Sequence, residues 1–206
     1  MILFSPLSSF DFGNLRSLYL AWGGAQIPEE SLRIIGQLIS LEQLSLSAGK
    51  TSGWQHQWLV DHDELRQHLR QLQGLTKLAL VRDTYPIPLP RLPPETYYEM
   101  RFADSEERED AEARPDIDMD QDTESEAQEG ESLLRDMEEL WERAHRNRML
   151  DQAEKYVAIF PKLEWMFCGQ RPMGFIETLE GSRAVPLTQG RDECRTYRQA
   201  IFRGSC

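Results

Sequence analysis

The chain has 206 residues, 40% of them hydrophobic, and a formal net charge of -12 at pH 7. Fourteen acidic and two basic residues lie between Asp104 and Glu131, so this one tract carries the whole excess of negative charge. The other 21 acidic and 21 basic residues balance. This balance argues against nucleic acid or anionic membrane as a general partner, because both need clustered basic charge.

The cysteines, the first residues and the apolar segments of the chain indicate which cellular compartment to expect. Cys168, Cys194 and Cys206 are odd in number and widely spaced, which argues against a disulfide framework and against a zinc site. Residues 1–6 lack the basic region of a signal peptide, and no apolar segment is long enough to span a bilayer. We therefore expect a cytoplasmic or nuclear protein with reduced thiols, no membrane contact and no cofactor.

The first predicted element is a strand at residues 15–20, with the pattern L-x-x-L-x-L. A helix is predicted to follow from Pro28, because acidic residues in its first turn suit the helix dipole and apolar residues then recur at steps of three and four. Residues 41–46 repeat the strand pattern.

The second strand runs into Gly49-Lys50-Thr51, which resembles the end of a phosphate-binding loop. That motif, G-x-x-x-x-G-K-[ST], requires a first glycine where this chain has Leu44, a residue suited to a core rather than to a left-handed turn. Residues 52–58 also lack the apolar spacing of a helix packed on a sheet. The sequence therefore argues against nucleotide hydrolysis through this segment.

A second helix is predicted from Asp61, which is an N-cap candidate followed three residues later by Glu64 in a capping-box spacing. Leucines over residues 65–72 form its apolar face, and Gly74 is the expected C-cap. The third strand, residues 75–80, again reads L-x-x-L-x-L.

Residues 103–131 are predicted to be a disordered acidic insertion, because their charges repel one another and aromatic residues are few. Its simplest role is a linker, and its functional alternative is binding of a basic partner. Beyond it, apolar spacing over residues 134–160 predicts one long or broken helix that ends at Pro161. The main basic cluster of that helix is expected to be solvated or to pair with Glu142 and Asp151 of the same helix; it consists of Arg146, Arg148 and Lys155.

The fourth strand, residues 163–168, keeps the pattern with Met166 and Cys168 in place of leucine. Residues 191–202 could form a terminal helix that caps the stack. The first leucines stand at 15, 41, 75 and 163, and the first step fits a leucine-rich repeat of roughly 20 to 29 residues, while the later steps need insertions.

The predicted fold is α/β: a leucine-rich-repeat-like solenoid fragment of about four strand-helix units with a disordered acidic insertion. The expected organisation is repeats over residues 1–102, the insertion over 103–131, and the long helix, last strand and cap over 132–206. The alternative is a small open α/β domain whose strands merely happen to begin with leucine.

Three stretches of the chain, residues 15–69, 74–90 and 141–173, resemble fungal F-box proteins whose C-terminal half is leucine-rich-repeat-like. The resemblance implies a substrate adaptor of a cullin-RING (SCF-type) ubiquitin ligase, in which the F-box holds a Skp1-type linker and the repeats hold the target. Here the repeats begin almost at Met1, and Leu92-Pro93-Pro94-Glu95, which looks like the opening of an F-box, is followed by the acidic tract. We therefore expect the repeat region alone, and a Skp1-type partner only for a longer form.

The expected binding surface is the strand face that points away from the leucines, because concave strand faces are the usual contact surfaces of solenoids. Two tryptophans in the loop after the second strand offer rigid aromatic area for a partner, or else cap the apolar edge of the stack. The residues expected to contact a partner protein are Arg16, Tyr19, Gln43, Ser45, Lys77, Trp165, Phe167, Trp54 and Trp58.

Catalytic and metal sites are not indicated by any motif. His56, His62 and His68 are spaced by six residues, which does not bring them to one helix face, and we expect them at the surface. No serine or cysteine stands in a recognisable nucleophile motif. The sequence thus favours a binding module, with an enzyme whose site carries no motif, or a truncated remnant without a partner, as the alternatives.

Overall fold

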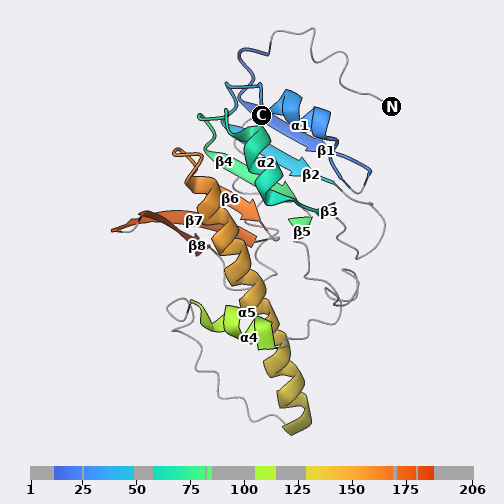
Figure 1. Ribbon diagram of the computed structural model, residues 1–206, viewed down its shortest axis with the longest axis vertical. Coiled ribbons are helices and arrows are strands. Elements are labelled where there is room, and N and C mark those ends of the chain that lie inside the picture. Colours follow the sequence, from blue (N-terminus) through green and yellow to red (C-terminus); the bar gives the residue numbers. More distant parts are fainter. Residues whose placement is uncertain are drawn as a thin grey trace. The chain divides into compact units, whose positions relative to one another are not determined.

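The computed structural model describes residues 12–24, 26–48, 58–81, 83–84, 105–114, 129–168, 171–179 and 181–187. Within these ranges the chain has an α/β arrangement with a six-stranded mixed sheet and four helices (Figure 1). The chain divides into two compact units, one of Met1–Pro86 with Gln152–Cys206 and one of Ile87–Asp151.

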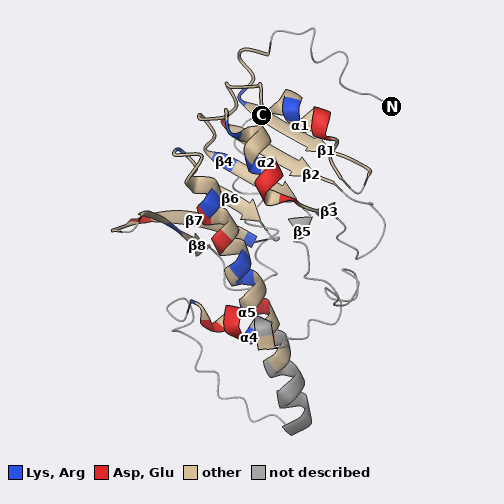
Figure 2. Ribbon diagram, in the orientation of Figure 1, with Lys and Arg blue, Asp and Glu red and all other residues tan. Residues whose placement is uncertain are grey.

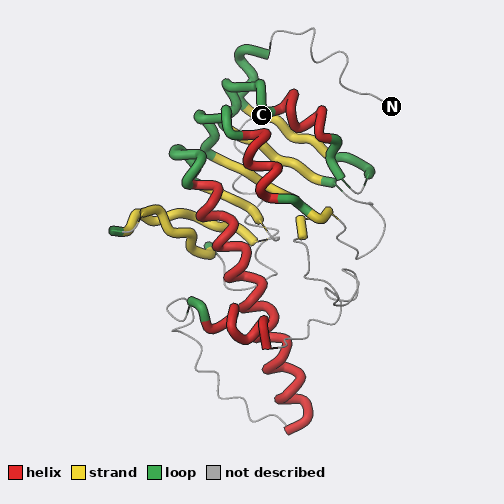
Figure 3. The backbone as a smooth tube through the Cα atoms, viewed as in Figure 1, coloured by secondary structure: helices red, strands yellow, loops and turns green. Residues whose placement is uncertain are grey.

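The sheet of the first unit contains all four strands that the repeated pattern predicts, side by side and in chain order (Figures 1 and 3). Each strand begins two residues later than expected, and the four run parallel to one another. The parallel strands are β1 (Ser17–Ala21), β2 (Gln43–Ser47), β4 (Lys77–Val81) and β6 (Trp165–Cys168). The prediction that these segments form one sheet is confirmed.

The pattern leucines form straight rows across the parallel strands. Leu18 lies opposite Leu44, Leu44 opposite Leu78, and Leu78 opposite Met166. Away from the edge strand β1, the side chains of this row are almost fully buried. Burial of each such side chain contributes about 1.5 to 3 kcal/mol to folding, so the rows form the centre of the core.

The first leucine of each pattern closes a turn and does not belong to the strand. Its N–H donates to the carbonyl three residues earlier, over 2.9 to 3.0 Å. The four pairs are Leu15 with Phe12, Leu41 with Leu38, Leu75 with Leu72, and Leu163 with Phe160. Since an apolar residue recurs at the acceptor position, the structural repeat is apolar-x-x-L-x-x-L-x-L, three residues longer than the pattern first recognised.

A second hydrogen-bond arrangement recurs at the entry of each strand. The Arg16 carbonyl accepts N–H groups of two successive residues in the next repeat, at 2.8 and 2.9 Å. The Glu42 carbonyl does the same at 2.8 and 3.1 Å, and the Thr76 carbonyl at 2.9 and 3.1 Å. Neighbouring units are therefore joined in the same register each time, whatever the length of chain between them.

Two short helices, α1 (Glu29–Ile35) and α2 (His62–Leu69), lie over the same face of the sheet (Figure 1). They approach closely at Gly36, where an added Cβ would lie 2.1 Å from the backbone oxygen of His68. The N-terminus of α2 is as predicted, because the Asp61 carboxylate accepts the backbone N–H of Glu64 at 2.9 Å. Gly74 is not the C-cap, since α2 ends at Leu69 and Arg70 occupies that position.

The Asp61 side chain stabilises the N-terminus of α2 through this capping contact. Replacement of Asp61 by alanine leaves a backbone N–H of α2 without its side-chain acceptor and should lower the free energy of unfolding by about 1 kcal/mol. Asp61→Asn keeps an oxygen at the same position and should change stability by less than half as much. Urea unfolding of both variants and the wild type measures the difference. Equal losses of stability in the two variants would show that the negative charge of Asp61 stabilises α2, rather than its hydrogen bond to Glu64.

The second unit contains α4 (Ser105–Glu112) and the greater part of α5 (Glu129–Val157). The long helix is confirmed, but it begins at Glu129, and α4 also falls within the tract 103–131 that was expected to be disordered, so that prediction is wrong for residues 105–112 and 129–131. Figure 2 shows the acidic residues along α4. Its formation depends on α5, whose Asn147 amide donates to the carbonyls of Asp110 and Ala111 at 2.8 and 3.2 Å.

Two ion pairs add to this contact between α4 and α5. Arg148 binds the Asp110 carboxylate, and Arg114 binds Asp151. Basic residues of α5 were expected to be solvated or to pair within their own helix, whereas Arg148 pairs with α4. An acidic helix with no basic residue in its last turn is intrinsically weak, so these tertiary partners supply the stabilisation that its sequence lacks.

Four strands were not predicted. β7 (Arg171–Thr178) and β8 (Gly181–Pro186) form an antiparallel hairpin that extends the main sheet beyond β6. Gly181 has a φ of 126°, which favours glycine at the hairpin turn. β3 (Trp58–Leu59) and β5 (Asp83–Thr84) form a separate two-stranded sheet. The predicted cap at 191–202 and the F-box-like stretch Leu92–Glu95 lie outside the described residues.

Candidate functional site

The strand face that points away from the leucine rows carries two further rows of side chains, set by the same register. One row consists of Ser17, Gln43, Lys77 and Trp165, and the other of Tyr19, Ser45, Ala79 and Phe167. All four side chains of the first row are partly exposed. Tyr19, on the edge strand β1, is 51% exposed.

The prediction that the whole of this face is exposed is wrong for the second row beyond Tyr19. Ser45 and Phe167 are 7% and 5% exposed, and Ala79, Val81 and Phe167 form a buried apolar cluster. The sequence of β4, Lys-Leu-Ala-Leu-Val, contains the signal, because four successive apolar residues are typical of a strand buried on both faces. Exposure on this face is thus confined to the strand entries and to β1.

An ion pair marks the exposed strand entries. Arg16 Nη1 lies 2.6 Å from Glu42 Oε1, and both side chains are largely solvent-exposed. An exposed pair of this kind contributes at most about 1 kcal/mol, so its charges remain available to a partner at small cost. Arg16, Gln43, Lys77 and Tyr19 therefore remain candidate contact residues, together with Trp165.

The structure describes one of the two tryptophans that were expected to contact a partner. Trp58 lies in β3 with 4% of its surface exposed, so it belongs to the core and does not offer the partner contact that was predicted. Trp54 lies outside the described residues, as does His56.

His62 is buried rather than exposed, which corrects the prediction of a surface histidine. Its Nδ1 lies 3.1 Å from the Tyr156 hydroxyl, and the two rings meet edge to face. The Arg66 guanidinium lies 5.0 Å from the centre of the Tyr156 ring and donates to Gln152 Oε1 at 3.0 Å. Burial, which is the larger cause, and the positive charge of Arg66 together lower the pKa of His62 to about 4.

This lowered pKa makes stability depend on pH. Because the folded state holds His62 neutral while the unfolded chain protonates it near pH 6.5, stability is fully present above about pH 6.5 and falls as the pH drops toward about 4. Between about pH 6.5 and about pH 5 the loss from this group should be about 2 kcal/mol. Urea midpoints measured across that range should fall more steeply for the wild type than for His62→Gln, whose side chain does not titrate. If the urea midpoints of the two proteins fell equally with pH, the pH dependence could not be assigned to His62.

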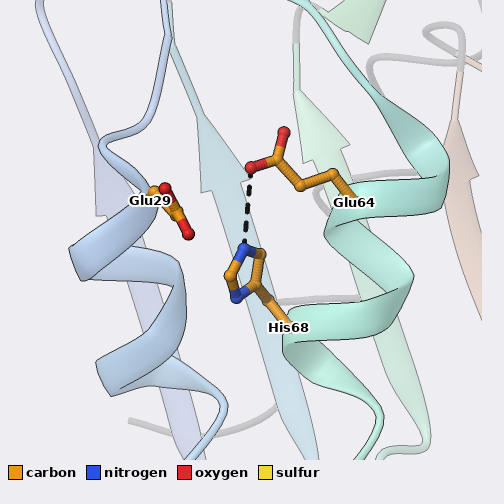
Figure 4. A group of neighbouring side chains, drawn as sticks. All are labelled: Glu29, Glu64 and His68. Atoms are coloured by element: carbon orange, nitrogen blue, oxygen red, sulfur yellow. Dashed lines mark ion pairs between the residues drawn. The ribbon is translucent and has the colours of Figure 1, made fainter.

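A cluster of metal-ligand types, which the sequence reasoning missed, joins α1 and α2. Glu29, Glu64 and His68 each offer one ligand atom, and these atoms lie within 4.8 Å of one another (Figure 4). His68 Nε2 is 3.6 Å from Glu64 Oε1. The spacing Glu-x-x-x-His on a predicted helix was a visible signal, but the third member comes from another helix and required the fold.

None of the helices in the described part of the chain combines the length and the apolar character needed to cross a bilayer. Comparisons with protein-family models, with curated proteins and with solved structures found no match. The function is therefore argued from the chain's own geometry.

Proposed function

We propose that this chain is a protein-binding module whose contact surface is the line of strand entries on the side of the sheet that faces away from α1 and α2 (Figure 1). The observation that carries the proposal is the common register of β1, β2, β4 and β6. Parallel neighbours lie about 4.8 Å apart, so one side chain from each strand forms a row of about 14 Å. The proposed contact residues are Arg16, Tyr19, Gln43, Lys77 and Trp165.

The residue types along this surface suit protein recognition. Tyrosine, tryptophan and arginine supply most of the binding energy in known interfaces, because they combine large rigid contact area with a polar group. Arg16 and Glu42 add one charge of each sign. We therefore propose a partner surface of mixed polarity rather than a strongly basic or strongly acidic one.

The arrangement of the units supports a leucine-rich-repeat-like stack as part of the same proposal. The parallel strands follow one another in chain order, and the same turn and the same carbonyl contacts recur from unit to unit. Together with the resemblance to fungal F-box proteins, this leads us to propose the target-recognition region of an F-box adaptor. Attachment to a ubiquitin ligase would then require an F-box in a longer form of the protein.

The surface is tested by affinity purification with matched variants. Tyr19→Ser removes an exposed aromatic side chain from the proposed surface, and Ile39→Ser removes an even more exposed apolar side chain from the turn before β2. We expect a partner captured by the wild type to be retained by Ile39→Ser and to bind Tyr19→Ser at least about tenfold more weakly, the loss typical of a hot-spot residue. Equal binding to both variants would place the contact surface elsewhere.

The adaptor part of the proposal needs a separate measurement. The chain as given and a fusion that adds an N-terminal F-box should be purified from cells and compared for a Skp1-type linker. We expect the linker with the fusion and not with the chain as given. Recovery of the linker by the chain as given would contradict the expectation that only the F-box binds it. Failure of both proteins to bind a target would contradict the recognition role.

A further inference from the structure

We propose that Glu29, Glu64 and His68 form a binding site for a divalent transition-metal ion, with zinc as the preferred metal. The site is independent of the proposed protein-binding surface, since it lies between α1 and α2 on the other side of the sheet (Figures 1 and 4). Glu64 and His68 stand four residues apart and so face the same side of α2. Glu29 is the first residue of α1.

The distances are close to those that tetrahedral zinc requires. Zinc binds imidazole nitrogen and carboxylate oxygen at about 2.0 to 2.2 Å, which puts neighbouring ligand atoms about 3.3 to 3.6 Å apart. His68 Nε2 and Glu64 Oε1 already meet this at 3.6 Å. No pair among the three ligand atoms exceeds 4.8 Å, so a shift of about 1 Å by the exposed Glu29 side chain completes the set.

The chemistry of the ligands selects the class of ion. An imidazole nitrogen favours zinc and its first-row neighbours over calcium and magnesium, which prefer oxygen alone. Two carboxylates neutralise the doubly charged ion. Both glutamates lie in first helical turns, where the helix dipole places about half a positive charge and so opposes a cation. Direct bonds to two full negative charges outweigh this partial charge.

The backbone holds the two sides of the site at a fixed separation. The close approach of Gly36 to the backbone of His68, which is itself a ligand residue, sets the distance between α1 and α2 at the His68 end of the site. A bound ion would join the helices of two successive repeats and stabilise the folded state. At a hundredfold excess over its dissociation constant, zinc should raise the melting temperature by about 5 to 10 °C.

The test is calorimetric titration of the full chain with zinc chloride, using the variants Glu64→Gln and His68→Gln. The matched control is Glu30→Gln, which removes the same charge from the neighbouring residue of α1, where Glu30 binds Arg33 at 2.8 Å. We expect both ligand variants to bind zinc about tenfold to a hundredfold more weakly and the control to bind as the wild type does. Equal affinity in all four proteins overturns the proposal.

Cobalt identifies the ligand atoms independently of affinity. Cobalt(II) should give a visible spectrum of a site with nitrogen and oxygen ligands, which disappears in His68→Gln and persists in Glu30→Gln. A sulfur-to-cobalt charge-transfer band would assign the metal to cysteine and overturn the proposal. Circular dichroism of each variant confirms folding, which exposed glutamate substitutions should leave intact.

Discussion

Replacement of Gly36 by alanine should destabilise the protein by more than about 3 kcal/mol. The added Cβ would lie 2.1 Å from the backbone oxygen of His68 and 3.1 Å from its carbonyl carbon. A side chain could rotate away from such a contact, but a backbone group within α2 cannot, so the two helices must separate. The φ of Gly36 is -61°, which any residue adopts, so the cost comes from close approach and not from backbone strain.

Gly23→Ala is the matched control for this substitution. A Cβ at Gly23 has no atom within 4 Å, so stability should change by no more than about 0.5 kcal/mol. Urea unfolding of both variants gives the comparison. A Gly36→Ala protein as stable as the Gly23→Ala protein would mean that α1 and α2 are not held together in solution.

Replacement of Leu78 by alanine should lower the free energy of unfolding by about 3 to 5 kcal/mol. Leu78 is 0% exposed and stands in the row between Leu44 and Met166, so truncation removes contacts on both sides and leaves a cavity that parallel strands cannot close. Leu78→Met should cost less than about 1.5 kcal/mol, because volume is conserved and methionine already occupies the same row in β6.

Ile39→Ala serves as the control for the core substitution, since Ile39 is 68% exposed. It removes a side chain of similar size at a cost of no more than about 0.5 kcal/mol. Equilibrium unfolding in urea separates the three proteins by their midpoints. A small loss for Leu78→Ala would contradict the assignment of the leucine rows to the centre of the core.

The sheet could be predicted because its determinants are local and repeated. A strand with leucine at every second position places all of its leucines on one face, and four copies of one pattern are consistent with one another. The two-residue error at each strand start has a single cause, since the first leucine closes a turn with an apolar residue three positions earlier. A search for a longer repeat would have found that residue in all four units.

The features that were missed depend on contacts distant in sequence. Helix α4 has an unfavourable composition and is held by Asn147 and Arg148, more than thirty residues away. His62 lies on the buried side of α2 because Tyr156 packs against it, and the spacing of histidines does not reveal that. The burial of Phe167 likewise depends on Ala79 and Val81 in a neighbouring strand.

The repeated turn fixes the nine-residue segment at the start of each unit and leaves the length of the connection between units free to vary. Nine residues from Phe12, Leu38, Leu72 and Phe160 onward determine how each unit joins the next, while the first leucines of successive units are 26, 34 and 88 positions apart. Lengthening a connection therefore leaves the alignment of strands unchanged, whereas deletion of one residue inside a nine-residue segment would turn its leucines toward the opposite face. Insertions are therefore tolerated between repeat units but not within the nine-residue segments. The largest of them, between β4 and β6, contains the whole second compact unit, Ile87–Asp151.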